Sequence, residues 1–344
     1  MLRECQTTPE SAYAGCVSGG WPVPCDRTRS CGARRPGACA VADVSGVQGS
    51  MAADRSTSEL AAVSGAPRSE RGSPGVLVLE PRSGWAGLGL HGLWSWRELI
   101  LALMWRDIRS RYRQAVLGIL WALIRPLTTM LVFAFVLGRL ARVDSEGQPY
   151  ALFSYTGLLA WGLFGSSVQS ASQSVLAASG FVTKVYFPRI LLPLSSIGAP
   201  ALDFLVAVLL LPPLLLYYGV ALRVEILLAP LVVLWIVVAA AGVGVLLAGI
   251  VVRHRDFGHA TTFLLQLWMY VTPVLYPINL LPDHLRAWAY LNPMAAPVEL
   301  FRATVLGTPV SPTGCAVSAA TSIAFLLLGL AVFARVERHF ADVI

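Results

Sequence analysis

Charge is what this sequence most clearly lacks. Only 13% of its 344 residues are charged, about half of the share found in soluble domains, whereas 56% are hydrophobic and the mean hydropathy is +0.66. So few charges cannot cover a water-exposed surface, and we therefore expect an integral membrane protein. The net charge of +7 requires no nucleic-acid partner, because cytoplasmic arginines give membrane proteins the same excess.

Lysine is nearly absent: Lys184 is the only one, and every other basic residue that the chain carries, histidine aside, is arginine. The phosphate-binding loop of ATPases has the pattern Gly-x-x-x-x-Gly-Lys-Ser/Thr. Lys184 follows Thr183 rather than glycine. The chain therefore has no ATP site of this type, and we expect it to be neither an enzyme nor the holder of a cofactor.

Motifs for metal binding or covalent catalysis are missing as well. The sequence has neither His-Glu-x-x-His nor Gly-x-Ser-x-Gly, and its five histidines are scattered. Five of the six cysteines lie within residues 5–39, at spacings typical of neither a zinc site nor a disulfide framework. A metal site there is the alternative to a disordered tail, while Cys315 is predicted to be a small core residue.

Ionisable residues inside the apolar segments are few, namely Arg125, Asp203 and His259. Ion-coupled carriers depend on such residues, and the chain shows no internal repeat of the kind that many carriers have. Asp203 is either a proton site or, as we favour, a carboxylate paired with arginine or backbone amides. A membrane-embedded transferase would need acids or a His–Asp set at one membrane level. Transport powered by another protein is therefore the favoured interpretation.

The chain divides into a polar tail and an apolar remainder. Residues 1–75 are rich in Gly, Ser, Ala, Arg and Pro, without sustained apolar periodicity, and are predicted to be disordered; Met51 is an alternative start. Residues 93–106 have helical apolar spacing with tryptophans, typical of an amphipathic helix on a membrane surface. The alternative is a surface helix of a soluble domain.

The long apolar runs after residue 115 predict an all-α protein with six transmembrane helices. The arginine-rich flanks place both termini in the cytoplasm, and we expect the chain to lie in the plasma (inner) membrane. The second span carries a polar row from Ser166 to Gln173, so its second half should pack on other helices or line a path. The predicted spans are residues 116–140, 151–176, 193–220, 226–252, 260–280 and 316–333.

Three stretches resemble a known family. They are WRELILALMWRDIRSRYRQAVLGILWALIRPL from Trp96, TKVYFPRILLPL from Thr183, and LYPINLLPDHLRAWAYLNPMAAPVELFR from Leu275. In order and spacing they are similar to permease subunits of ABC-2-type exporters of polysaccharide, O-antigen or teichoic acid. The resemblance covers residues 76–344. Arg125 departs from it, because the family usually has an uncharged polar residue there.

The resemblance implies six spans per subunit, a homodimer, and two copies of a separate ABC ATPase that binds ATP and Mg²⁺. It further implies an interface helix at residues 93–106, a coupling helix at 180–188, and two outer gate helices at 282–306. From pattern alone, the alternative for the last segment is a long structured external loop. An ABC-2-type permease that exports a drug or lipid is the alternative function.

The implied substrate is a glycan on a polyprenyl diphosphate. Arginine side chains bind phosphate oxygens with two parallel hydrogen bonds, and aromatic rings can stack on sugars. Anchoring to anionic lipid and ordinary interfacial packing are the alternatives for these two groups. The predicted substrate-binding residues are Arg109, Arg111, Tyr112, Arg113, Trp121, Trp161 and Tyr270.

The only lysine lies in the predicted coupling helix, between Gly180 and Pro188. Because the chain lacks an ATP site, we expect this inner loop to dock on the ATPase, with apolar side chains filling a groove and basic ones making polar contacts. The alternative is a tight inner turn held by lipid phosphates. The predicted coupling residues are Phe181, Lys184, Val185, Tyr186 and Arg189.

Overall fold

A computed structural model describes residues 16–18, 21–23, 96–113, 117–182, 187–221 and 223–337. The chain divides into two compact units, Met1–Val76 and Leu77–Ile344. In the first, the strands β1 (Cys16–Ser18) and β2 (Trp21–Val23) pair in antiparallel fashion. The rest of the predicted disordered tail, residues 1–75, lies outside the described residues.

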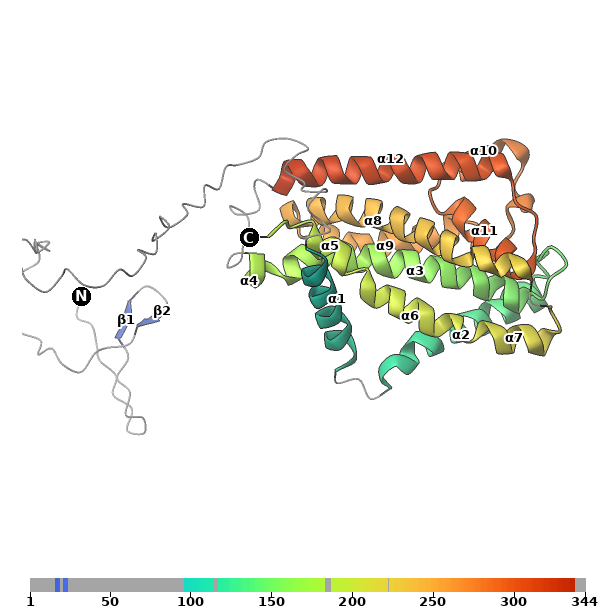
Figure 1. The fold of residues 1–344 in the computed structure, drawn as a ribbon, viewed down its shortest axis with the longest axis horizontal. Coiled ribbons are helices and arrows are strands. Elements are labelled where there is room, and N and C mark those ends of the chain that lie inside the picture. The colour runs from blue at the N-terminus through green and yellow to red at the C-terminus, as the bar shows by residue number, and fades with distance from the viewer. Residues whose placement is uncertain are drawn as a thin grey trace, which may run out of the picture. The chain divides into compact units, whose positions relative to one another are not determined.

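Every element among the described residues of the second unit is a helix, which confirms the predicted all-α class (Figure 1). Its helices are α1 (Arg97–Tyr112), η3 (Gly118–Leu120), α2 (Trp121–Phe133), the π-helix η4 (Ala134–Leu140), α3 (Tyr150–Ala177), α4 (Ser179–Val182), α5 (Leu191–Ser195), α6 (Gly198–Val208), α7 (Leu211–Tyr218), η5 (Val224–Leu228), α8 (Ala229–Arg253), α9 (Phe257–Val271), η6 (Ile278–Leu280), α10 (Asp283–Ala289), α11 (Ala295–Leu306) and α12 (Pro312–Val336).

Five segments among the described residues are long and apolar enough to cross a membrane. Each overlaps one of the predicted spans, and the ends agree within a few residues. These five are Gly118–Leu140, Tyr150–Ala177, Leu191–Tyr218, Val224–Arg253 and Pro312–Val336. The predicted total of six is therefore not reached by helix length alone.

The remaining predicted span, 260–280, is wrong as a continuous helix. Helix α9 ends at Val271, and Thr272 has extended backbone angles. Pro273 follows Thr272, and a residue that precedes proline is sterically driven out of the helical region. The chain then turns through residues 272–277 before the short helix η6.

Helix α3 is the centre of the bundle. Nineteen of its residues are buried, and it packs on α8, α6, α2, α11 and α9. The polar row in its second half is tolerated because the helix faces other helices rather than lipid. Helices α8 and α12 approach closely, since a Cβ at Gly242 would lie 2.7 Å from the backbone nitrogen of Leu326.

The two ends of the bundle carry different features. In Figure 1 the carboxyl ends of α3, α8 and α12 gather at one end, together with α4 and α5, while α7, α10 and the end of η4 lie at the other. Helix α1 runs across the direction of the long helices (Figure 1) and packs on α5 and α6. The chain thus has one end with the predicted inner loops and another with the predicted outer ones.

Candidate functional site

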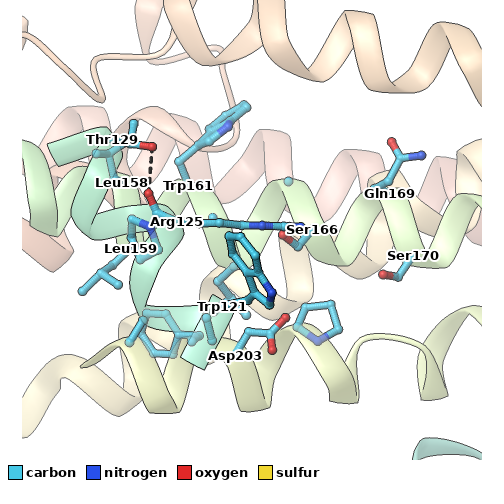
Figure 2. A pocket seen from close by; sticks show the side chains of 18 of the residues that line it. Trp121, Arg125, Thr129, Leu158, Leu159, Trp161, Ser166, Gln169, Ser170 and Asp203 are labelled. Carbon is cyan, nitrogen blue, oxygen red and sulfur yellow. Dashed lines mark hydrogen bonds between the residues drawn. The ribbon is translucent and has the colours of Figure 1, made fainter. Parts of the chain in front are cut away.

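A cavity of about 790 Å³ lies beside the central helix. Its walls come from α1, α2, α3, α6 and α9, so segments far apart in the sequence meet there (Figure 2). The lining combines apolar, hydroxyl, amide, aromatic and charged side chains. Four predicted substrate-binding residues line this cavity: Arg111, Tyr112, Trp121 and Trp161.

The other three predicted substrate-binding residues lie elsewhere. Arg109 and Arg113 are exposed on α1 and at its end, and do not line the cavity. Tyr270 is 50% exposed near the end of α9 and is also absent from the lining. Of the predicted residues, the structure therefore brings together Arg111, the neighbouring Tyr112 and both tryptophans.

The charged centre of the cavity is an ion pair between α1 and α6. The guanidinium of Arg111 donates to a carboxylate oxygen of Asp203 at 2.6 Å and to the hydroxyl of Ser170 on α3 at 3.1 Å. The phenol of Tyr112 donates to the other oxygen of the Asp203 carboxylate. The predicted pairing of Asp203 with an arginine is confirmed.

Half of the polar row on α3 faces this cavity. Ser166, Gln169 and Ser170 line it, whereas Ser167 and Ser172 are buried. The hydroxyl of Thr262 on α9 donates to the amide oxygen of Gln169 at 3.2 Å. The row was expected either to pack on other helices or to line a path. The buried serines do the first, and the three residues that line the cavity do the second. Hydroxyls and amides are groups that can exchange hydrogen bonds with sugar hydroxyls.

A second cation enters the cavity from α2. Arg125 lines it, one turn after Trp121 and one turn before Thr129, and its side chain points into the space between α2 and α3 (Figure 2). Pro126 cannot donate a backbone hydrogen bond. Separately, the Thr129 hydroxyl donates to the carbonyl of Arg125 at 2.9 Å. A lone arginine in an apolar span is costly unless it faces protein or water, and here it faces the cavity.

The cavity tryptophans differ in accessibility. Trp121 is 46% exposed, so its ring is free to meet a ligand. Trp161 is buried in an aromatic cluster, with ring centroids 5.3 Å from Phe164 and 6.3 Å from Trp268. Trp161 therefore forms part of the wall, and Trp121 is the more accessible ring.

The predicted coupling segment is described only in part. Lys184, Val185 and Tyr186 lie outside the described residues, and so does the side chain of Phe181 at the end of α4. Arg189 donates from its guanidinium to the carbonyl of Glu337, after α12, at 3.1 Å. The following residues Ile190, Leu191 and Leu192 are buried in one cluster with Leu103 of α1. The described residues that follow the segment are thus packed directly against α1.

A second buried polar group lies between α9 and α11. Arg302 is 2% exposed, donates to the carbonyl of Val274 at 2.9 Å, and stands 3.6 Å from the centroid of the Phe153 ring. Tyr290 donates to the buried Glu299 carboxylate at 2.8 Å. Arg302 thereby satisfies a carbonyl that the break after α9 leaves unpaired.

The substrate-binding residues predicted from the sequence do not include every polar residue at the cavity. Ser170 and Thr262 were not expected at the site, although the polar row signalled the first, and nothing near Thr262 in sequence signals the second. Among the described residues, no three His, Cys, Asp or Glu side chains come together as a metal site. The arrangement offers binding groups for an anion, hydroxyls and rings.

Long apolar helices around a cavity of mixed polarity define a multi-pass membrane protein. The family profile described as "ABC-2 type transporter" matches residues 98–306. The chain is also similar to proteins named O-antigen export system permease protein RfbA. The one from Myxococcus xanthus is 32% identical over 191 residues, which are 56% of this chain and 73% of the relative. One from Klebsiella pneumoniae is 25% identical over 248 residues, or 72% and 95%.

The chain belongs to the ABC-2 type transporter family, as its resemblance predicted. Members of this family are membrane components of transporters, and the family implies an ABC ATPase as partner. The matched range begins inside α1 and ends at Leu306 of α11. It therefore includes every element that lines the cavity.

Proposed function

We propose that this chain is the permease subunit of an ATP-driven exporter of lipid-linked polysaccharide. The substrate is a glycan on a polyprenyl diphosphate, which moves from the cytoplasmic to the outer face of the plasma membrane. The names of the relatives support an O-antigen-like glycan. The complex contains two copies of this chain and two of the ATPase, which binds ATP and Mg²⁺.

The observation that carries this proposal is the composition of the cavity. Arg111 and Arg125 are cations suited to phosphate oxygens, and the α3 row supplies groups suited to sugar hydroxyls. Trp121 adds an accessible aromatic face. A polymer slides best over many weak contacts, and hydroxyls and one open ring provide such contacts without fixing one register.

The chain crosses the membrane six times if α9 and residues 272–277 together form one crossing. Helix α9 has 15 residues and spans about 22 Å, short of a hydrocarbon core of about 30 Å. The non-helical residues 272–277 complete the crossing, and the guanidinium of Arg302 donates to the carbonyls of Pro273 and Val274. Non-helical backbone is tolerated at membrane depth when protein covers it. Both termini are then cytoplasmic.

The crossing helix α1 serves as the interface helix, and the segment between α3 and α5 as the ATPase docking site. Leu101 and Trp105 are exposed on α1, by 56% and 60%, as expected of a helix whose apolar side chains enter the membrane surface. Helices α10 and α11 lie within residues 282–306 and are proposed as the outer gate.

The test is reconstitution with the partner ATPase in liposomes. Addition of the lipid-linked glycan should stimulate ATP hydrolysis, and Trp121→Ala should reduce the stimulation several-fold while basal hydrolysis stays unchanged. Tyr217→Ala provides the control, because the Tyr217 ring is exposed on α7 and does not line the cavity. Stimulation by small amphiphiles but not by glycan lipids would favour the drug or lipid exporter. Failure to associate with any ABC ATPase would contradict the proposal.

A further inference from the structure

Two of the anion-binding side chains of the cavity, Arg111 and Tyr112, are already occupied by an internal anion, the Asp203 carboxylate. Arg111 directs one guanidinium nitrogen at Asp203 and another at Ser170, and Tyr112 donates to the same carboxylate. The Arg111 guanidinium and the Tyr112 phenol, which are both suited to bind a phosphate group, therefore donate to one aspartate. An incoming phosphate can reach them only where the carboxylate leaves.

Asp203 is itself an unusual residue for its position. It is the only charged residue in the apolar segment Leu191–Tyr218. An isolated carboxylate there is costly, and such residues usually have a function. The pair is not sealed, since the side chains of Arg111 and Asp203 are 36% and 29% exposed and both line the cavity. A ligand in the cavity therefore has access to it.

The helix that bears Asp203 is bounded by two breaks. α6 is separated from α5 at residues 196–197 and from α7 at 209–210. Helix α1 packs on α6 so closely that a Cβ at Gly198 would collide with the Met104 side chain. Helix α5, directly before α6, follows the predicted ATPase docking segment. The Asp203 carboxylate thus lies one short helix away from that segment.

We propose that Asp203 holds the place of the substrate diphosphate in the empty transporter. The inference rests on the proposed function and adds a step to it. The diphosphate oxygens accept hydrogen bonds from Arg111, Tyr112 and Ser170, and the Asp203 carboxylate leaves these donors. No covalent bond changes, since one anion is exchanged for another. Loss of the Asp203 contacts frees α6 from α1, and occupancy of the cavity is thereby transmitted toward the docking segment.

The exchange predicts that removing the internal anion strengthens binding. Asp203→Asn keeps an oxygen for Tyr112 but removes the charge that competes with phosphate. The complex of permease and ATPase in nanodiscs is titrated with undecaprenyl diphosphate, undecaprenol and inorganic pyrophosphate. We expect the Kd of undecaprenyl diphosphate to fall about tenfold, which corresponds to about 1.4 kcal/mol, with no change for undecaprenol. Asp107→Asn is the matched control, because Asp107 on α1 pairs with Arg106 and does not line the cavity.

The alternative is that the Arg111–Asp203 ion pair only holds α1 and α6 together, as a structural brace. A second variant distinguishes this alternative from the exchange. The double variant Arg111→Asp with Asp203→Arg restores the brace with its charges reversed. We expect it to unfold at the wild-type temperature but to have lost affinity for undecaprenyl diphosphate. Retained affinity would overturn the exchange, and this variant decides the question if Asp203→Asn does not fold.

The binding titration separates this inference from the proposed function. Unchanged or weaker binding by folded Asp203→Asn, with binding by the wild type, would overturn the exchange alone. Absence of binding by the wild type would remove both. An equal gain in affinity for inorganic pyrophosphate would support the exchange and assign the recognition to the phosphates without the lipid.

Discussion

At the scale of single residues, Arg302 is the buried side chain that links α11 to the break after α9. Its guanidinium serves the carbonyl of Val274 and covers the Phe153 ring. Replacement by methionine keeps much of the volume but leaves buried carbonyls unpaired, at about 1–3 kcal/mol each. We expect Arg302→Met to lower the unfolding temperature in detergent by roughly 4–8 °C.

The control for Arg302 is Arg223, whose side chain is 51% exposed and lies 3.9 Å from Glu225. Exposed pairs of this kind contribute little to stability. Arg223→Met should therefore unfold close to the wild-type temperature. If both substitutions lowered the unfolding temperature equally, the burial of Arg302 would not explain its contribution to stability.

Glu299 should make the stability dependent on pH. Burial raises the pKa of its carboxyl above the usual 4.5, and the hydrogen bond from Tyr290 offsets this only in part. Because the folded state favours the protonated form, the free energy of unfolding contributed by this group increases as the pH falls through the raised pKa. At higher pH the buried carboxylate remains ionised and destabilises the fold.

Glu299→Gln should therefore raise the unfolding temperature most at pH 8, by roughly 2 °C or more. The advantage over the wild type should shrink as the pH approaches 4.5, the ordinary value for a glutamate. Thermal unfolding of both proteins across this pH range measures the difference. A constant difference at all pH values would contradict a titrating Glu299.

At the scale of elements, the contact between α8 and α12 depends on glycine. A Cβ at Gly242 would lie 2.7 Å from the Leu326 backbone nitrogen, which cannot move out of the way as a flexible side chain can. Gly242→Ala should separate the helices and lower the unfolding temperature by several degrees. Gly162→Ala on α3 is the control, since a Cβ there meets no atom within 4 Å, and it should be neutral or slightly stabilising.

The elements were predictable from sequence to the extent that hydrophobic length decides them. Spans such as Val224–Arg253, which contains an 18-residue stretch with a mean hydropathy of 2.8, leave no other solution in a membrane. The end of α9 was missed because Thr272–Pro273 is a local steric signal inside an apolar run. The three-part division of Leu191–Tyr218 gives no signal in hydropathy either.

The site was predictable only in part, because it depends on which faces meet. Arg109, Arg111 and Arg113 look alike in sequence, yet only Arg111 lines the cavity. The register of α1 against α6 decides this choice, and register is a property of packing. Asp203 was recognisable as a paired acid, but its partner could be identified only once α1 and α6 had been placed side by side.

At the scale of the whole molecule, the topology is open to a labelling test. In a cysteine-free background, Asp283→Cys should react with a membrane-impermeant maleimide in intact cells, because Asp283 is exposed on α10, at the predicted outer end. Glu337→Cys, after α12, should react only after lysis. If α9 did not cross, the two positions would exchange their accessibility.

The short α9 gives the bilayer itself an influence on transport. Helix α9 covers only about 22 Å of a core of about 30 Å, and the non-helical residues 272–277 have to complete this crossing. A backbone that no regular helix fixes should be the part of the crossing that a thicker bilayer strains. Glycan-stimulated ATP hydrolysis should accordingly be lower in phosphatidylcholine with acyl chains of about 20 carbons than in chains of about 14. A membrane of changing lipid composition would then regulate the exporter through a single helix.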